Sequence, residues 1–233
     1  MPSFLLWPLP LLGLLLASAR CAAEPMPSSS YGEVTQAQEI VVLLPGIKDR
    51  GADFDDEGFV AAAKPLIQQR RLALIAADAH FGYYRARTVY QRLYEDVLKP
   101  LPPTPITLAG ISLGGFGALG LARRHPERVR RLLLLAPFLG DDAFIERLRR
   151  DGLAARKNDE AFEQELLAAW RYLSTPRKLP QIELWYGAGD DFAPAYALLH
   201  QKNPQLTMHA LDGGHDWHTW LALWKSWLAR LSR

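Results

Sequence analysis

The chain has 233 residues, 49% of them hydrophobic, and its formal net charge is +2 at pH 7. This length allows one domain with a sizeable core but not a second large domain. Because acidic and basic residues nearly balance and the basic ones are scattered, we expect a small-molecule substrate and no nucleic-acid partner. Cys21 is the only cysteine, which excludes an intramolecular disulfide and a zinc site of CxxC type.

The N-terminus carries an apolar run from Leu5 to Ala19, and Ala17-Ser18-Ala19 has the A-x-A form that precedes signal-peptidase cleavage. We expect a signal peptide over residues 1–23 and export to the periplasm or secretion. The alternative is an uncleaved N-terminal apolar segment that anchors the protein to the membrane or associates with it transiently. The run is short for a membrane span, which needs about 20 residues.

Residues 24–38 are rich in Pro, Ser and Gly, and this composition predicts a linker. The folded domain is therefore expected over residues 39–233. Within it, residues 141–180 form the longest interval between predicted strands and contain two helical patterns. We expect them to form a small helical insertion near the carboxyl ends of the strands, where open α/β sheets bind ligands.

The domain alternates short apolar runs with longer segments that have apolar residues at three-and-four spacing. The apolar runs lack a polar alternation, as do strands buried on both faces of a parallel sheet. They are Ile40–Leu44, Leu72–Ala77, Ile106–Ala109, Leu132–Ala136, Ile182–Tyr186 and Leu206–Leu211. Helices are predicted over Phe59–Arg70, Thr88–Leu98, Phe116–His125, Ala143–Leu153, Phe162–Tyr172, Ala195–Gln201 and Thr219–Leu231. This order predicts an α/β fold with a doubly wound, mostly parallel sheet of about six strands flanked by helices.

Gly110-Ile111-Ser112-Leu113-Gly114 lies between the third predicted strand and the helix that follows it. A nucleophilic serine on such a turn needs a strained backbone with positive φ, and small neighbours that let strand and helix pass closely. Ser112 is therefore the predicted nucleophile. The alternatives are a glycine-rich turn without a catalytic role and a phosphate-binding turn at a helix N-terminus.

A serine nucleophile needs a base, and a neutral imidazole can take its proton near pH 7. His215 follows the last predicted strand on a loop that begins Asp212-Gly213-Gly214, so we assign it as the base. His218 is the competing histidine. It lies next to the last predicted helix and is more simply a helix-face residue.

The imidazole in turn needs a carboxylate that accepts its other N–H. Asp190, on the loop after the fifth predicted strand, is our assignment. Asp191 is the alternative on the same loop, although it could instead cap the next helix. Asp141 and Asp142, after the fourth predicted strand, are further alternatives.

The segments around Ser112, Asp190 and His215 resemble the α/β-hydrolase superfamily, particularly its small bacterial esterases. The resemblance covers Glu39 to the C-terminus and includes the chain order Ser, Asp, His. It implies an oxyanion hole made by two backbone N–H groups, here those of Leu113 and Ile47. Pro45-Gly46 stands where the family often has His-Gly, and the first hairpin strands of larger members are absent, so we expect a reduced version of the fold.

This reading predicts a serine hydrolase that cleaves a carboxylic ester-type bond of a small substrate through an acyl-serine intermediate. A thioesterase or acyltransferase with the same triad, and a catalytically inactive binding module of this fold, are the alternatives. The mechanism requires no metal or organic cofactor. The acids of residues 53–57 could suggest a cation site, but they open a predicted helix and are more simply partners of its dipole. The candidates for an aromatic pocket wall are Phe81, Tyr83 and Tyr84, with Trp170 and Tyr172 in the insertion; packing of the cap and helices is the alternative.

Overall fold

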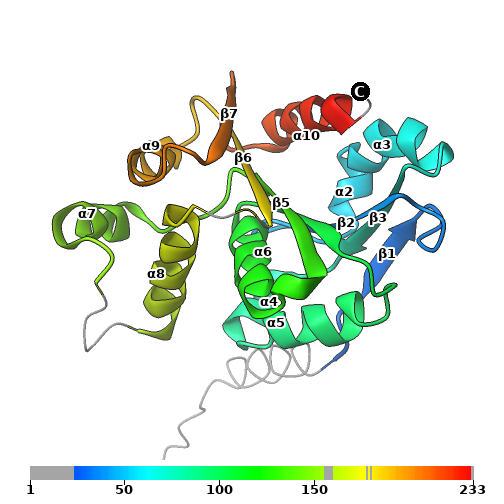
Figure 1. The fold of residues 1–233 in the computed structure, drawn as a ribbon, viewed down its shortest axis with the longest axis horizontal. Coiled ribbons are helices and arrows are strands. Elements are labelled where there is room, and N and C mark those ends of the chain that lie inside the picture. The colour runs from blue at the N-terminus through cyan, green and yellow to red at the C-terminus, as the bar shows by residue number, and fades with distance from the viewer. Residues whose placement is uncertain (1–23, 155–159, 177, 179, 232–233) are drawn as a thin grey trace, which may run out of the picture.

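The computed structural model describes residues 24–154, 160–176, 178 and 180–231. Within them, one sheet has the strand order β1-β3-β2-β4-β5-β6-β7 (Figure 1). The strands are β1 Ser28–Tyr31, β2 Glu39–Leu44, β3 Leu72–Ala77, β4 Ile106–Ile111, β5 Val129–Leu135, β6 Gln181–Gly187 and β7 Thr207–Leu211. All neighbours from β3 to β7 pair in parallel, which confirms the predicted α/β class and its mostly parallel sheet.

The additional strand, β1, lies in the segment that was predicted to be a linker, so that prediction was wrong over these residues. β1 pairs antiparallel with β3, with Ser28 opposite Ala77 and Tyr31 opposite Leu74. Met26, just before it, is buried and donates its N–H to the Asp96 carboxylate at 2.8 Å. The sequence did not predict this strand, because its Ser-Ser-Ser-Tyr sequence shows no apolar pattern. It is a mostly exposed edge strand that backbone pairing holds in place.

Helices cover both faces of the sheet (Figure 1). One face is covered by α2 Asp53–Asp56, α3 Phe59–Gln68 and α10 Trp217–Leu231, whose aromatic side chains pack on the strands. The other is covered by α4 Phe81–Arg85, α5 Val89–Arg92, α6 Leu113–Arg124, α7 Asp142–Asp151, α8 Ala161–Ser174 and α9 Ala193–Lys202. A π-helical turn at Leu93–Leu98 extends α5, and a 3-10 turn at Pro126–Arg128 precedes β5.

The segment 141–180, which was expected to be a helical insertion, contains α7 and α8. In Figure 1 both lie to one side of the sheet, and α8 packs against α6 and α9. Trp170 on α8 is fully buried and donates its indole N–H to the Leu139 carbonyl at 2.7 Å, so it is a core residue rather than part of a pocket wall. The insertion is therefore anchored to the main core and borders the carboxyl ends of the strands.

None of the helices within the described ranges has both the length and the apolar character that a bilayer span requires. The predicted signal peptide over residues 1–23 lies outside the described residues. Export from the cytoplasm and association with a membrane therefore stay predictions from the sequence.

Candidate active site

Ser112 occupies the sharp turn between β4 and α6. Its backbone has φ 50° and ψ −116°, which is the positive φ that the pattern predicts for such a serine and carries strain of about 1–3 kcal/mol. Backbone hydrogen bonds hold the turn: the Ser112 N–H donates to the Leu135 carbonyl at 3.0 Å, and its own carbonyl accepts from Phe138 at 2.9 Å. Helix α6 begins at Leu113, three residues earlier than predicted, so the turn contains Ser112 alone.

Two glycines make this turn sterically feasible. A Cβ atom on Gly110 would overlap the backbone of Gly114, and one on Gly114 would overlap the backbone of Leu44 on the neighbouring strand. Only hydrogen side chains let β4, α6 and β2 approach so closely. The spacing Gly-x-Ser-x-Gly is therefore required by packing at this position.

His215 lies between the two other predicted residues and binds both. Its Nε2 atom is 3.0 Å from the Ser112 Oγ atom, and its Nδ1 atom is 2.8 Å from an Asp190 carboxylate oxygen. Phe192 and Trp220 present ring edges to the imidazole at centroid distances of 4.9 and 5.0 Å. The ring is thus oriented by a carboxylate on one side, the serine on the other, and an aromatic residue on each flank.

The Asp190 carboxylate is fully buried, and both of its oxygens are bound. Oδ2 faces His215, while Oδ1 accepts the backbone N–H of Phe192 at 2.8 Å. A buried carboxylate is stable only when it is hydrogen-bonded and paired in this way. The loop that carries it is tied to the histidine loop, because the Gly189 N–H donates to the Gly213 carbonyl at 2.8 Å.

The alternative residues lie outside this hydrogen-bonded chain. Asp191 and His218 are exposed. Asp141 caps α7, with its Oδ1 atom accepting the Phe144 N–H at 2.9 Å, and Asp142 is exposed in the first turn of that helix. The structure therefore brings together Ser112, Asp190 and His215.

The two N–H groups assigned to the oxyanion hole lie on segments that border Ser112. Leu113 is the first residue of α6, where backbone N–H groups have no acceptor within the helix and the helix dipole favours a negative charge. Ile47 follows Gly46, and a Cβ atom on Gly46 would be 3.8 Å from the Ser112 Cβ atom. Their role as oxyanion donors stays a prediction.

Asp49 is a residue of this site that the sequence analysis missed. Its carboxylate lies against Gly46, its N–H donates to the Gly46 carbonyl at 3.3 Å, and it accepts the indole N–H of Trp217 at 3.4 Å. Burial raises the pKa of the Asp49 carboxyl, and the Trp217 hydrogen bond opposes that rise. Asp49 thus connects the loop after β2 with the loop that carries His215. The signal for it was its position on a loop at a strand end.

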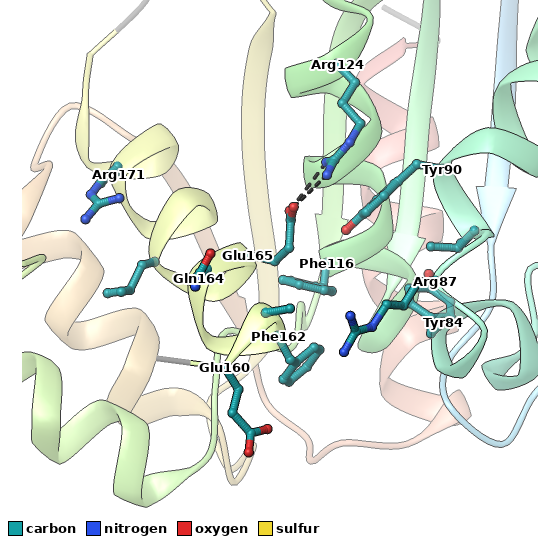
Figure 2. Close-up of a pocket in the computed structure, with 13 residues that line it drawn as sticks. Tyr84, Arg87, Tyr90, Phe116, Arg124, Glu160, Phe162, Gln164, Glu165 and Arg171 are labelled. Atoms are coloured by element: carbon teal, nitrogen blue, oxygen red, sulfur yellow. Dashed lines mark hydrogen bonds and ion pairs between the residues drawn. The ribbon is translucent and has the colours of Figure 1, made fainter. Parts of the chain in front are cut away.

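A cavity of about 600 Å³ lies between α8 and the segment from α4 to α6 (Figure 2). Tyr84, one of the predicted wall residues, lines it and donates its hydroxyl to the Leu113 carbonyl at 3.3 Å. Burial raises the pKa of Tyr84 well above its usual range, so the hydroxyl stays protonated. Tyr83 is instead buried in the core.

The chain was compared with known protein families and curated proteins. Residues 76–165, which include Ser112, match the family model described as alpha/beta hydrolase fold. A pimeloyl-[acyl-carrier protein] methyl ester esterase of Aromatoleum aromaticum is 50% identical over 42 residues, which are 18% of this chain and 17% of that protein. The chain thus matches about a sixth of the length of this curated relative.

Solved structures resemble the chain over most of its length. An S-formylglutathione hydrolase from Staphylococcus aureus has a TM-score of 0.59 at 17% identity, with 85% of this chain and 82% of that one covered. A thioesterase domain from the curacin biosynthetic pathway has a TM-score of 0.59 at 16% identity and covers 90% of this chain and 100% of its own. A ferulic acid esterase has a TM-score of 0.60 at 13% identity, with 90% and 98% covered.

At these identities the structural likeness shows the fold. Together with the family match over residues 76–165 and the sheet order, it shows that the chain has an α/β-hydrolase fold.

Proposed function

We propose that the protein is a serine hydrolase that cleaves a carboxylic ester-type bond of a small substrate through an acyl-serine intermediate. The observation that carries the proposal is the continuous hydrogen-bonded chain from the Ser112 hydroxyl through His215 to the buried Asp190 carboxylate. Nucleophile, base and orienting acid come from three separate strand-end segments, and the serine stands on a strained turn with positive φ.

In the proposed first step, His215 Nε2 accepts the Ser112 proton as Oγ attacks the substrate carbonyl carbon. The carbonyl oxygen becomes an oxyanion, for which the proposed donors are the backbone N–H groups of Leu113 and Ile47. Each such donor lowers the barrier by about 3–4 kcal/mol. The carbon–oxygen bond to the leaving group then breaks, and the imidazolium gives its proton to the departing alcohol.

In the second step, water attacks the acyl-serine. His215 accepts a proton from that water, and the oxyanion forms again. As it collapses, the imidazolium returns the proton to Ser112 Oγ, and the carboxylic acid is released. Asp190 accepts a hydrogen bond from the Nδ1–H group throughout and does not take the proton, so Nε2 stays free to act as the base. The chain's own residues account for each proton transfer, so the proposal invokes no cofactor.

The proposal is tested by hydrolysis of p-nitrophenyl acetate by the wild type, Ser112→Ala and Ser29→Ala. Ser29 is a matched control, because it lies exposed on the edge strand β1. We expect activity in the wild type and in Ser29→Ala, and a loss of about 10⁴-fold or more in Ser112→Ala. Full activity in Ser112→Ala would overturn the assignment, and an inert wild type would indicate a binding module.

A thioesterase is the second candidate function, since one of the similar structures is a thioesterase domain. The same triad could cleave either bond. Oxygen and sulfur esters of one acyl group, compared by kcat/KM, distinguish the two activities. Adding an alcohol acceptor to the same assay tests for an acyltransferase, because a transferase yields a new ester instead of the free acid.

A further inference from the structure

We propose that the cavity beside α8 binds the acyl group of the substrate, and that it takes an apolar, ring-bearing acyl group with a negative charge at its far end. This inference rests on the proposed function, because it names the substrate class of the same site. The cavity volume of about 600 Å³ lies within the range of small-molecule sites, which is roughly 300–1,000 Å³.

The cavity adjoins the hydrogen-bonded chain although none of its three members lines it. Phe116, on the cavity wall, is one helical turn beyond Ser112 and donates its N–H to the Ser112 carbonyl at 3.3 Å. From the opposite wall, Phe162 begins a row of ring contacts through Phe138 and Phe192 that ends on His215, with centroid distances of 6.3, 5.5 and 4.9 Å. These contacts connect both cavity walls with the residues of the proposed triad, and the proposal takes the cavity as the space into which an acyl group on Ser112 extends.

The walls nearest this space are aromatic. Phe116 from α6 and Phe162 from α8 have ring centroids 5.4 Å apart, and Tyr84 and Tyr90 line the same cavity from α4 and α5. Figure 2 shows Phe116 and Phe162 between the two sides of the cavity. Phe162 is 47% exposed, so its ring offers a free face to a ligand. Flat apolar groups gain most from such walls, through burial and offset or edge-on ring contacts.

Of the three arginines that line the cavity, Arg87 is the one whose side chain has no hydrogen bond or ion pair with the residues that the structure describes. Arg124 is held by Glu165 in a 2.6 Å ion pair and lies over the Tyr90 ring at 3.9 Å. Arg171 donates to the Leu153 carbonyl at 2.6 Å. Among the residues that the structure describes, Arg87 has no carboxylate within the 4.0 Å of an ion pair. Its guanidinium is therefore available to pair with an anionic group.

Arg87 is held in an unusual way for a long side chain. Its φ is 59°, in the left-handed region that glycine and asparagine occupy more cheaply. Figure 2 shows the side chain directed from its loop toward Phe162, whereas the Glu160 carboxylate points away from that space. This direction places a positive charge at the aromatic cavity, where a carboxylate at the end of the acyl group would meet it.

The test uses methyl esters of 3-phenylpropanoic acid with a carboxylate, a carboxamide or an aminomethyl group at the para position of the ring. The three compounds have the same ester group and the same leaving group, methanol. Differences in kcat/KM therefore report the effect of the charge at the para position. We expect the carboxylate ester to exceed the carboxamide ester about tenfold, with the cationic ester slowest. Equal rates, or a faster cationic ester, would overturn the proposal.

Two variants distinguish a direct contact between Arg87 and the distal carboxylate from a long-range effect of positive charge. Arg87→Gln should abolish the advantage of the carboxylate ester and leave the carboxamide ester unchanged. Arg85→Gln is the matched control, since Arg85 is exposed in the last turn of α4 and does not line the cavity. An equal effect of Arg85→Gln would attribute the preference to long-range charge and refute the assignment of Arg87.

A further variant tests the cavity itself. Ala161, exposed at the start of α8, lines it, and Ala161→Trp should fill it and slow all three ring esters about tenfold. p-Nitrophenyl acetate is too small to reach it and should react as before in every variant. If acetate is hydrolysed but the ring esters are not, or if Ala161→Trp leaves them unaffected, the cavity assignment fails while the proposed function stands. If acetate is not hydrolysed, the proposed function fails.

Discussion

Replacing Asp190 with asparagine is expected to abolish the proposed hydrolase activity by changing which imidazole nitrogen carries the proton. The Oδ1 atom of Asp190 accepts the Phe192 backbone N–H at 2.8 Å, and only the amide oxygen of an asparagine can keep that bond. The amide NH₂ must then face His215 Nδ1, which is 2.8 Å from Oδ2 in the wild type. A donor in that position requires Nδ1 to be an acceptor, and the proton moves to Nε2.

With a proton on Nε2, His215 cannot accept the proton of Ser112. For serine proteases this wrong tautomer costs about 10⁴ in kcat, or roughly 5 kcal/mol of barrier, and we expect a similar loss here. The assay is kcat for p-nitrophenyl acetate, with the melting temperature as a check on folding. The melting temperature should shift by only a few degrees, because the hydrogen-bond pattern and the volume of the side chain are retained.

The neighbouring acid supplies the control. Asp191 is exposed and takes no part in the hydrogen bonds among Ser112, His215 and Asp190, so Asp191→Asn should keep nearly full activity. Asp141→Asn should also keep it, because asparagine retains an acceptor for the Phe144 N–H at the start of α7. If Asp190→Asn is nearly as active as the wild type, or if Asp191→Asn is inactive, the tautomer argument and the assignment of the acid are both wrong.

Three other outcomes are expected. Gly114→Ala should destabilise the fold by several kcal/mol in chemical denaturation, because its Cβ atom would overlap the Leu44 backbone; a loss below about 1 kcal/mol would show that the turn can relax. Burial raises the pKa of Asp49, so its contribution to stability is full below the unfolded pKa and is lost as pH rises through the folded pKa. Asp49→Asn should therefore stabilise the protein near neutral pH, by under about 1 kcal/mol because the group is half-exposed, and this gain should vanish in acid. A gain that persists in acid would show that the raised pKa of Asp49 is not its cause. N-terminal sequencing of the protein from its native cell should find a mature chain that begins between Arg20 and Glu24, and an intact Met1 in the cytoplasm would refute export.

The fold was predictable where local patterns and tertiary burial coincide. β2 to β5 are buried on nearly all positions, so their apolar runs stand out in the sequence. β1 was not predictable in this way, because its side chains are mostly exposed and its stability comes from pairing with β3, which no local pattern encodes. The early start of α6 also escaped prediction, since Gly114 and Gly115 have low helix propensity, yet both are buried within the first turn of this helix.

The candidate site shows the same division. The turn at Ser112 was predictable because its steric demands require glycines at fixed spacing. The position of His215 was predictable because the topology brings the strand-end loops to one edge of the sheet. The choice between Asp190 and Asp191 could not be derived from spacing, since both lie on one loop, and only the packed structure shows which of them is buried against His215. Asp49 and the cavity beside α8 depend on contacts between segments far apart in the chain, such as that of Asp49 with Trp217.

The central claim is that Ser112 forms a covalent acyl intermediate, and mapping a covalent adduct tests it most directly. The purified protein is treated with a fluorophosphonate, which reacts with an activated serine, digested with protease and analysed by mass spectrometry. The account predicts a single adduct on Ser112, formed much more slowly in His215→Ala, where the base is missing. An adduct on another serine, or no reaction in a protein that still hydrolyses esters, would contradict it.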